Sequence, residues 1–350
     1  RFGLLSSPAQ GRDVNLDVNR VFGYRKFCNK LWNMFKFADS MATLLAFKPP
    51  ADLDTSIMSM SLSERDRWIL NRCAIAARDT RKCIEEYQFG AACSTVYDFF
   101  MKEFCGVYLE LVKPVLKEEG DSKLAAQATL YLCIDVGLRM THPIMPFITE
   151  ELYQRLPKRE GDTTETISLA NYPGNSEAMK SWLNDSVDEK VKVVLAATDG
   201  FMALRGEFLS GAYSGKRPNA YVICPSGGKN ESYIKSQADD ISTLAKLNSL
   251  TVLAASESAP IGCCTKLCGD IQVFLQLKGI VDFGKEVAKL HKETKKITGQ
   301  MTILAKQMSS PLYENVPVEV RSRDQEKLDT AKAKVAAVEE TLKMFEQLAM

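Results

Sequence analysis

Hydrophobic residues recur at spacings of three and four along most of the chain, which is typical of amphipathic helices. The clearest early case predicts one helix over residues 15–40. Asp13 or Asp17 can cap its start, because a short side-chain oxygen accepts a free first-turn N–H. The apolar positions of this helix are Val21, Phe27, Leu31, Met34 and Phe35.

The next segments predict more helices. Ser61 and Glu64 have the spacing of a capping box, in which each satisfies a free N–H of a helix that runs to about Tyr87. Further helices are expected at residues 91–112, 123–140 and 147–155, and prolines punctuate the connections. Within HPIMPFITEELYQ we expect Phe147, Ile148 and Leu152 to fill the core. Residues 1–160 therefore predict a helical bundle.

The composition then shifts to Pro, Gly, Thr and Lys, and residues 161–180 are expected to be an interdomain linker. A helix is expected at residues 184–209. The segments AYVIC (220–224), LTVL (250–253) and IQVFLQL (271–277) are strand candidates, with a helix expected at residues 231–247. Residues 181–278 thus predict a small α/β domain with a short sheet.

The last segment has the most regular periodicity. Two series of apolar residues, from Ile280 to Met308 and from Leu328 to Ala349, are separated by SSPLYENVPVEV, whose prolines forbid a continuous helix. Two such seams predict an antiparallel coiled-coil hairpin over residues 279–350. The predicted fold class is mainly α: a helical bundle, a small α/β domain and this hairpin.

Composition bounds the function classes. The chain of 350 residues has a net charge of +1, so any attraction to an anion must be local. Its ten cysteines lack paired spacing, and no signal peptide or long apolar span occurs. These features favour free thiols in a cytoplasmic protein without a membrane partner. The first residues, RFGLL, resemble the end of a helix from a longer protein.

Catalytic and metal-binding candidates are weak. The only histidines are His142 and His291, and neither has an evident Ser or Cys partner. His142, before a proline, is better explained by packing or capping. Cys263, Cys264 and Cys268 cluster without a second pair at zinc-site spacing. No phosphate-binding G-x-x-x-x-G-K-[ST] loop occurs. We expect no active site, metal or cofactor within this chain.

The first helix carries a second face of a different kind, with cationic, amide and aromatic side chains. Such groups suit an unpaired nucleotide, because cations bind phosphate, amides reach base edges and a ring stacks on a base. A solvated face whose Phe37 turns into the core explains the same pattern, and the pattern alone favours that explanation. The face comprises Arg25, Asn29, Lys30, Asn33 and Phe37.

Resemblance to a known family changes this balance. GRDVNLDVNR followed by YRKFCNKLWNMFKF resembles the first helix of the anticodon-binding domain of valyl-tRNA synthetases. HPIMPFITEELYQ is similar to a segment shared by the valine, leucine and isoleucine class I synthetases, and the lysine-rich hairpin resembles the C-terminal appendage of the valine enzymes. The three segments stand in the family's order and span nearly the whole chain.

The resemblance implies a role for the first helix in binding the anticodon of tRNA(Val). It makes Phe37 the candidate for stacking and Lys30 a phosphate or base contact, with Asn33 and Arg25 as weaker candidates. Asn19 and Arg20, at the helix entrance, can also reach the anticodon loop. Because some relatives have a cation at the Asn19 position, we assign this residue no fixed role.

The first arm of the predicted hairpin presents a ridge of lysines, whereas the second arm has six basic and six acidic residues from Arg321 to Met350. Lysines outside a coiled-coil seam often serve solubility, but the asymmetry favours an anionic partner. By resemblance, that partner is the tRNA elbow, where the D and T loops meet. The candidate residues are Lys285, Lys289, Lys292, Lys295 and Lys296.

The resemblance implies that the intact enzyme activates valine with ATP and Mg²⁺ and transfers it to tRNA. The HIGH-like and KMSKS-like motifs that hold ATP in class I synthetases are absent from this sequence. The chain is therefore expected to be a non-catalytic tRNA-binding region that binds no DNA. The alternative is a scaffold whose coiled coil docks another protein, such as another translation factor.

Overall fold

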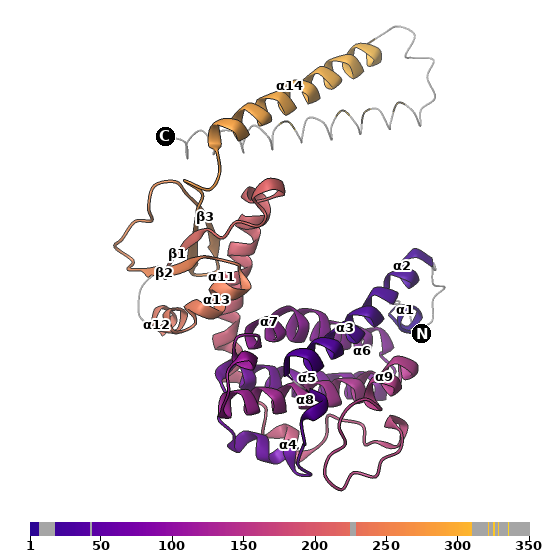
Figure 1. The fold of residues 1–350 in the computed structure, drawn as a ribbon. Helices are drawn as coiled ribbons and strands as arrows, with labels where there is room; N and C mark the ends of the chain where they lie inside the picture. The colour runs from indigo at the N-terminus through magenta and orange to yellow at the C-terminus, as the bar shows by residue number, and fades with distance from the viewer. Residues whose placement is uncertain are drawn as a thin grey trace. The chain divides into compact units, whose positions relative to one another are not determined.

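The computed structural model describes residues 1–6, 18–42, 44–224 and 229–309, together with the single residues 321, 325, 328 and 335. The described part is mainly helical and contains a four-stranded mixed sheet. Two compact units, Arg1–Val193 and Val194–Met350, divide the chain (Figure 1). We describe each unit by itself.

The first unit is a bundle in which α5 and α8 lie side by side at the centre (Figure 1). Short 3₁₀ turns join several helices. The helices are α1 (Phe2–Leu5), α2 (Val18–Gly23), α3 (Arg25–Ala42), α4 (Leu53–Ser56), α5 (Glu64–Glu85), α6 (Phe89–Asp98), the π-helical stretch Phe99–Tyr108, α7 (Leu109–Val112), α8 (Asp121–Thr141), α9 (Pro146–Tyr153), α10 (Glu177–Lys180) and the first part of α11 (Asp185–Phe208).

The helix expected over residues 15–40 is in fact two helices, α2 and α3, that meet at Tyr24. The break follows Gly23, the last residue of α2. Glycine has a low helix propensity, because without a side chain its backbone loses more conformational entropy in a helix. The Tyr24 ring lies 4.9 Å from the Phe2 ring, so packing on α1 stabilises the turn. The proposed caps, Asp13 and Asp17, lie outside the described residues.

The capping box of α5 lies two residues later than expected. Ser63 Oγ accepts from the Asp66 N–H, and Asp66 Oδ2 accepts from the Ser63 N–H at 2.9 Å. The prediction of Ser61 and Glu64 was therefore wrong. Asp66 is only 4% exposed, and its other oxygen accepts a hydrogen bond from the Tyr108 hydroxyl at 2.6 Å. This contact joins the start of α5 to the end of the π-helical stretch. It explains why Asp66, and not Glu64, is the acidic residue of the capping box.

Aromatic rings fill the space between α3, α6 and α8. Phe99 and Phe104, five residues apart, stack with ring centroids 5.9 Å apart, as the wide turn of a π-helix allows. Gly137 of α8 permits close contact, because a Cβ there would lie 2.5 Å from Phe100 Cζ. Phe147 was wrongly expected to fill this core. It is 85% exposed in the first turn of α9, whereas Leu152 is buried.

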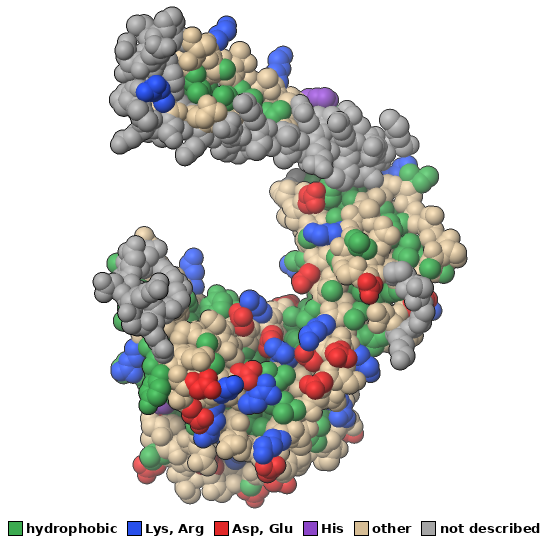
Figure 2. All heavy atoms as spheres, turned by 180° about the vertical axis from the view of Figure 1, so that it is seen from behind, with side chains coloured by type: hydrophobic (Ala, Val, Ile, Leu, Met, Phe, Trp, Pro, Cys, Tyr) green, Lys and Arg blue, Asp and Glu red, His purple; other side chains and the backbone are tan. Residues whose placement is uncertain are grey.

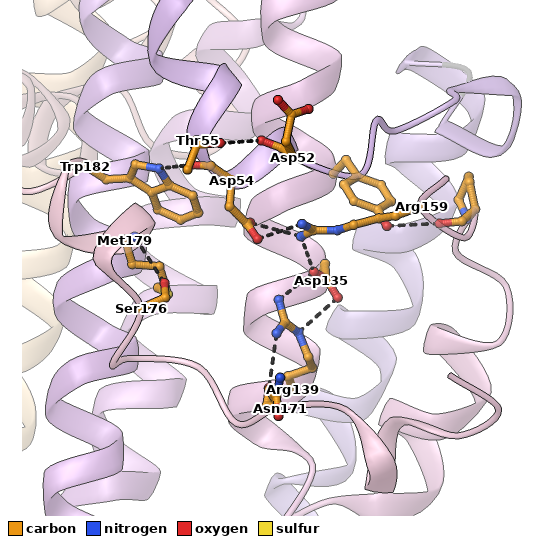
Figure 3. Close-up of polar contacts among 12 residues, drawn as sticks. Asp52, Asp54, Thr55, Asp135, Arg139, Arg159, Asn171, Ser176, Met179 and Trp182 are labelled. Atoms are coloured by element: carbon orange, nitrogen blue, oxygen red, sulfur yellow. Dashed lines mark hydrogen bonds and ion pairs between the residues drawn. The ribbon is translucent and has the colours of Figure 1, made fainter. Parts of the chain in front are cut away.

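A network of charged side chains around the buried Asp135 joins α4, α8 and the segment after α9 (Figure 3). Asp135 of α8 accepts two hydrogen bonds from Arg139, at 3.1 and 2.6 Å, and one from Arg159 at 2.9 Å. Arg159 also makes a bidentate pair with Asp54 of α4, at 2.7 and 3.0 Å. Charge-assisted bonds of this kind are strong when both partners leave water together. The network holds the segment around Arg159 on the bundle.

Residues expected to form a linker also pack on the first unit. Arg139 donates to the Asn171 carbonyl at 3.1 Å, and Trp182, just after the expected linker, donates its indole N–H to the Asp54 carbonyl at 2.9 Å (Figure 3). Ile167, Met179 and Trp182 are buried. These contacts make the segment between α9 and α11 part of the bundle's surface layer.

The second unit contains a sheet with strand order β2-β1-β4-β3. Strand β1 (Asn219–Ile223) pairs parallel with β2 (Ser249–Leu253) and antiparallel with β4 (Ile271–Gln276), which pairs antiparallel with β3 (Cys263–Cys268). The buried face carries Ala220, Val222, Val273 and Leu275. Strand β3 was not predicted, and the expected helix over residues 231–247 is two, α12 (Lys229–Ser236) and α13 (Ala238–Leu244).

Helix α14 (Phe283–Met308) corresponds to the first arm of the predicted hairpin. Most of residues 310–350, which contain the breaker and the second arm, lie outside the described residues. The antiparallel coiled coil therefore stays a prediction.

We expect Asp135→Ala to lower the free energy of unfolding by about 3–5 kcal/mol, because it leaves two partly buried guanidinium groups without their shared carboxylate. Urea unfolding followed by circular dichroism measures this change. Asp79→Ala is the control, because Asp79 makes an exposed pair with Arg78 at 2.8 Å. It should cost about 1 kcal/mol or less. Equal effects of the two variants would contradict a structural role for the network.

Candidate nucleic-acid interface

The orientation of α3 is fixed by one apolar stripe. Phe27, Leu31, Met34, Phe35 and Ala38 are each no more than 5% exposed, and the helix packs on α8, α9 and the π-helical stretch. With 3.6 residues per turn, burial of this stripe leaves the polar residues of α3 facing solvent or lying along the two edges of its contact with the bundle. The side chains along the edges are therefore held by the packing of the stripe.

One edge of α3 combines a cation, an amide and an aromatic ring. Lys30 and Phe37 are half-buried there and Asn33 is exposed beside them. The edge borders the π-helical stretch and α7. Burial raises the pKa of the Cys105 thiol to about 11 and the nearby Lys30 ammonium lowers it, which places Lys30 close to this stretch. We name Lys30, Asn33 and Phe37, with Lys113, the α3 edge.

Lys113 completes the α3 edge and was not found from the sequence. Its ammonium nitrogen lies 5.5 Å from the centroid of the Phe37 ring, within the range of a cation–π contact. It also pairs with Glu110 at 2.6 Å. A lysine distant in sequence gives no local signal for this contact. The contact keeps the Phe37 ring in place at the surface.

The groups of the α3 edge suit RNA chemically. Within the described part of the chain, neither Lys30 nor Asn33 makes a side-chain hydrogen bond or an ion pair with protein, so both can bind another molecule. Helix α3 carries four basic residues and one acidic residue, Asp39. Figure 2 shows acidic and basic side chains interspersed over the face of the helical unit in view, so that face carries no large area of one charge.

The other predicted anticodon residues do not share this edge. Arg25 is exposed and lines a pocket with Tyr24, Cys28 and Phe147. It precedes Phe37 by twelve residues, about 18 Å along a helix axis. Asn19 is exposed on α2, and the side chain of Arg20 lies outside the described part. The structure thus brings together Lys30, Asn33 and Phe37 but not the other three.

The lysines of α14 are described only in part. Lys292 and Lys295 are exposed. The side chains of Lys285, Lys289 and Lys296 lie outside the described part. The two exposed lysines supply positive charge on the outer surface of the helix.

Histidine and metal chemistry have little support in this structure. His142 contacts Thr149 Oγ1 at 2.8 Å and Ser168 Oγ at 3.0 Å, and burial lowers the pKa of its imidazole. Its ring therefore joins the end of α8 to the segment around Ser168. No group of three His, Cys, Asp or Glu side chains that could hold a metal ion is found among the described residues. None of the described helices is long and apolar enough to cross a membrane.

Two segments of the chain match known protein families. Residues 66–208 match the family described as the anticodon-binding domain of tRNA ligase, and residues 282–346 match the valyl tRNA synthetase tRNA binding arm. The chain is also 36% identical to the valine–tRNA ligases of Takifugu rubripes and Homo sapiens, over 99% of its own length. By these matches the chain is similar to the C-terminal part of the valyl-tRNA synthetases.

The match to the valyl-tRNA synthetases extends beyond animals. The chain is 35% identical to the valine–tRNA ligase of Syntrophotalea carbinolica over 99% of its length, which is 37% of that relative. It spans 28% and 27% of the length of the Takifugu rubripes and Homo sapiens relatives. Lys113 lies within the anticodon-binding match and the α14 lysines within the arm match, whereas α3 precedes both. Residues 209–281 lie between the two matches.

The geometry of α3 predicts that its edge can be changed without unfolding the bundle. Phe37 is half-buried, and we expect Phe37→Ala to cost about 1 kcal/mol of unfolding free energy. Phe27, 2% exposed, lies among the rings of Phe2, Tyr97 and Phe100. Phe27→Ala should cost about 3–5 kcal/mol. Thermal and urea unfolding measure both, and equal costs would mean that Phe37 is a core residue.

Proposed function

We propose that this chain binds tRNA(Val) through two surfaces, the α3 edge for the anticodon stem-loop and the lysines of α14 for the tRNA elbow. The α3 edge is the observation that carries the proposal. It holds an aromatic ring, an amide and a cation on one helix, with a second cation from Lys113, the combination that unpaired nucleotides require. The matches to an anticodon-binding domain and to a tRNA binding arm support the same ligand.

Each side chain of the α3 edge has a proposed task. Phe37 stacks on an anticodon base, with Lys113 holding the opposite side of the ring. Lys30 contacts a phosphate or a base, and Asn33 binds a base edge through its amide. Arg25, Asn19 and Arg20 are proposed contacts of the flanking stem, because they lie toward the start of α3 or on α2.

The activity of the whole protein is also a proposal, because the chain spans little more than a quarter of the animal relatives. The intact enzyme would use ATP and Mg²⁺ to activate valine and would transfer it to tRNA in the cytoplasm. The chain's own contribution is orientation. Binding energy released far from the reacting ester places the acceptor end in the active site and so lowers the barrier to transfer.

We expect Phe37→Ala to weaken binding of the valine anticodon stem-loop by about 1–3 kcal/mol, the range for one stacked base. Fluorescence anisotropy with a labelled stem-loop measures the affinity, and circular dichroism checks the fold. Phe89→Ala is the control, because Phe89 is an exposed aromatic residue at the start of α6. A folded Phe37→Ala variant that binds like the parent chain would disprove the stacking role.

Charge removal on α14 should act on whole tRNA but not on the isolated stem-loop, which has no elbow. We expect the Lys292→Ala/Lys295→Ala variant to reduce the log–log salt slope for tRNA by about 1.4–1.8, since each phosphate contributes about 0.7–0.9. Anisotropy titrations over a salt series test this with both ligands. An unchanged slope for tRNA would favour the alternative in which the arm docks another protein.

A further inference from the structure

Four cations, Arg205, Lys216, Arg217 and Lys246, lie at one end of the sheet in the second unit. Only Arg205 falls within a family match. Arg205, in the last turn of α11, is only 7% exposed. Its guanidinium donates to the Lys216 carbonyl at 2.9 Å, the Lys246 carbonyl at 3.2 Å and the Ser214 carbonyl at 3.2 Å. One buried side chain thus holds the backbone of two exposed lysines around itself.

Among the residues that the structure describes, no carboxylate pairs with Arg205. Arg205 bonds only to carbonyl oxygens, and burial together with the nearby Arg217 lowers its pKa. Lys216, Arg217 and Lys246 are exposed, and none of the four cations makes an ion pair in the part of the chain that the structure describes. Buried charges in proteins are normally paired, because desolvation is costly. An anionic ligand would relieve the mutual repulsion of this group.

The backbone at Lys246 supports a role beyond structure. Lys246 has φ of 55° and ends α13 in a Schellman motif, in which the Leu247 N–H donates to the Ser242 carbonyl at 2.9 Å. Glycine is the usual residue there because it has no Cβ to strain the left-handed conformation. The chain has a lysine at this position despite that cost.

The neighbouring strand ends provide a rigid polar surface. Asn219 begins β1, and its Oδ1 accepts from Asn248 Nδ2 at 2.8 Å and from Ser249 Oγ at 2.9 Å. Its amide nitrogen donates to Gln276 Oε1 at 3.1 Å. These bonds fix the starts of β1 and β2, which begin two residues after Arg217 and three residues after Lys246. The cations therefore lie at a defined end of the sheet.

We propose that Lys216, Arg217 and Lys246, arranged around Arg205, bind the phosphodiester backbone of RNA and form a further tRNA contact of this chain. The cations are exposed and come from two separate turns, an arrangement that suits successive phosphates of a strand better than one enclosed anion. The inference rests on the proposed function in taking tRNA as the ligand. Arg205 acts as a positioning residue that sets the spacing of the exposed cations.

The first test removes two exposed charges with Lys216→Gln/Arg217→Gln. The control is Lys235→Gln/Lys266→Gln, which removes two exposed lysines from α12 and β3 of the same unit. Anisotropy titrations of the full chain with tRNA over a salt series should show weaker binding and a slope smaller by about 1.4–1.8 for the test variant only. Equal slopes for the two double variants would overturn the proposal.

The second test separates binding from structure. Lys246→Gly removes the charge and relieves the left-handed backbone, so we expect a higher melting temperature together with a lower tRNA affinity. A variant that is stabilised but binds tRNA as the parent chain does would assign Lys246 to the fold alone and overturn the proposal. A parent chain that binds no tRNA would also overturn the proposed function. If Phe37→Ala weakens tRNA binding and none of the variants at Lys216, Arg217 and Lys246 does, this inference is overturned and the proposed function stands.

Discussion

The helical unit depends on the burial of one stripe of α3 against α8, α9 and the π-helical stretch. Because this stripe is almost completely excluded from water, the helix cannot rotate without exposing Phe27 and Leu31. The same constraint determines which polar side chains reach the surface and at what depth. Lys30 and Phe37 lie at the margin of the contact, where a side chain is supported on one side and open on the other. Burial of the apolar stripe of α3 therefore determines both the position of this helix in the fold and the side chains of the candidate interface.

The two units treat buried charge differently. In the first, Asp135 is shared by two arginines, and the network spans α4, α8 and the segment that follows α9. In the second, Arg205 is buried among carbonyl oxygens with Arg217 nearby, and no described carboxylate pairs with it. The first arrangement is electrostatically complete and serves stability. The second leaves positive charge without a paired carboxylate among the described residues.

The sequence predicted the features that local periodicity determines and missed those that depend on contacts between distant segments. The long helices α5, α8 and α11 follow from their apolar spacing. The capping box was placed at Ser61 because Ser61 and Ser63 both have suitable spacing, and the choice depends on the contact of Asp66 with a distant tyrosine. Strand β3 has a mostly exposed CCTKLC sequence and owes its conformation to pairing with β4. For the same reason Lys113 could not be assigned to the Phe37 ring from sequence.

Ion pairs within the protein also distinguish lysines and arginines that can bind RNA phosphates from those that add little to RNA binding. A lysine or arginine already paired with a carboxylate, such as Arg72 with Glu103 at 2.6 Å, must give up that pair before it can neutralise a phosphate. An unpaired cation on a fixed backbone releases counterions at no such cost. In a chain with a net charge of +1, this difference matters more than the number of basic residues. Lys30 on α3 and Arg217 before β1 meet the condition, and both stand on elements whose positions are set by buried contacts.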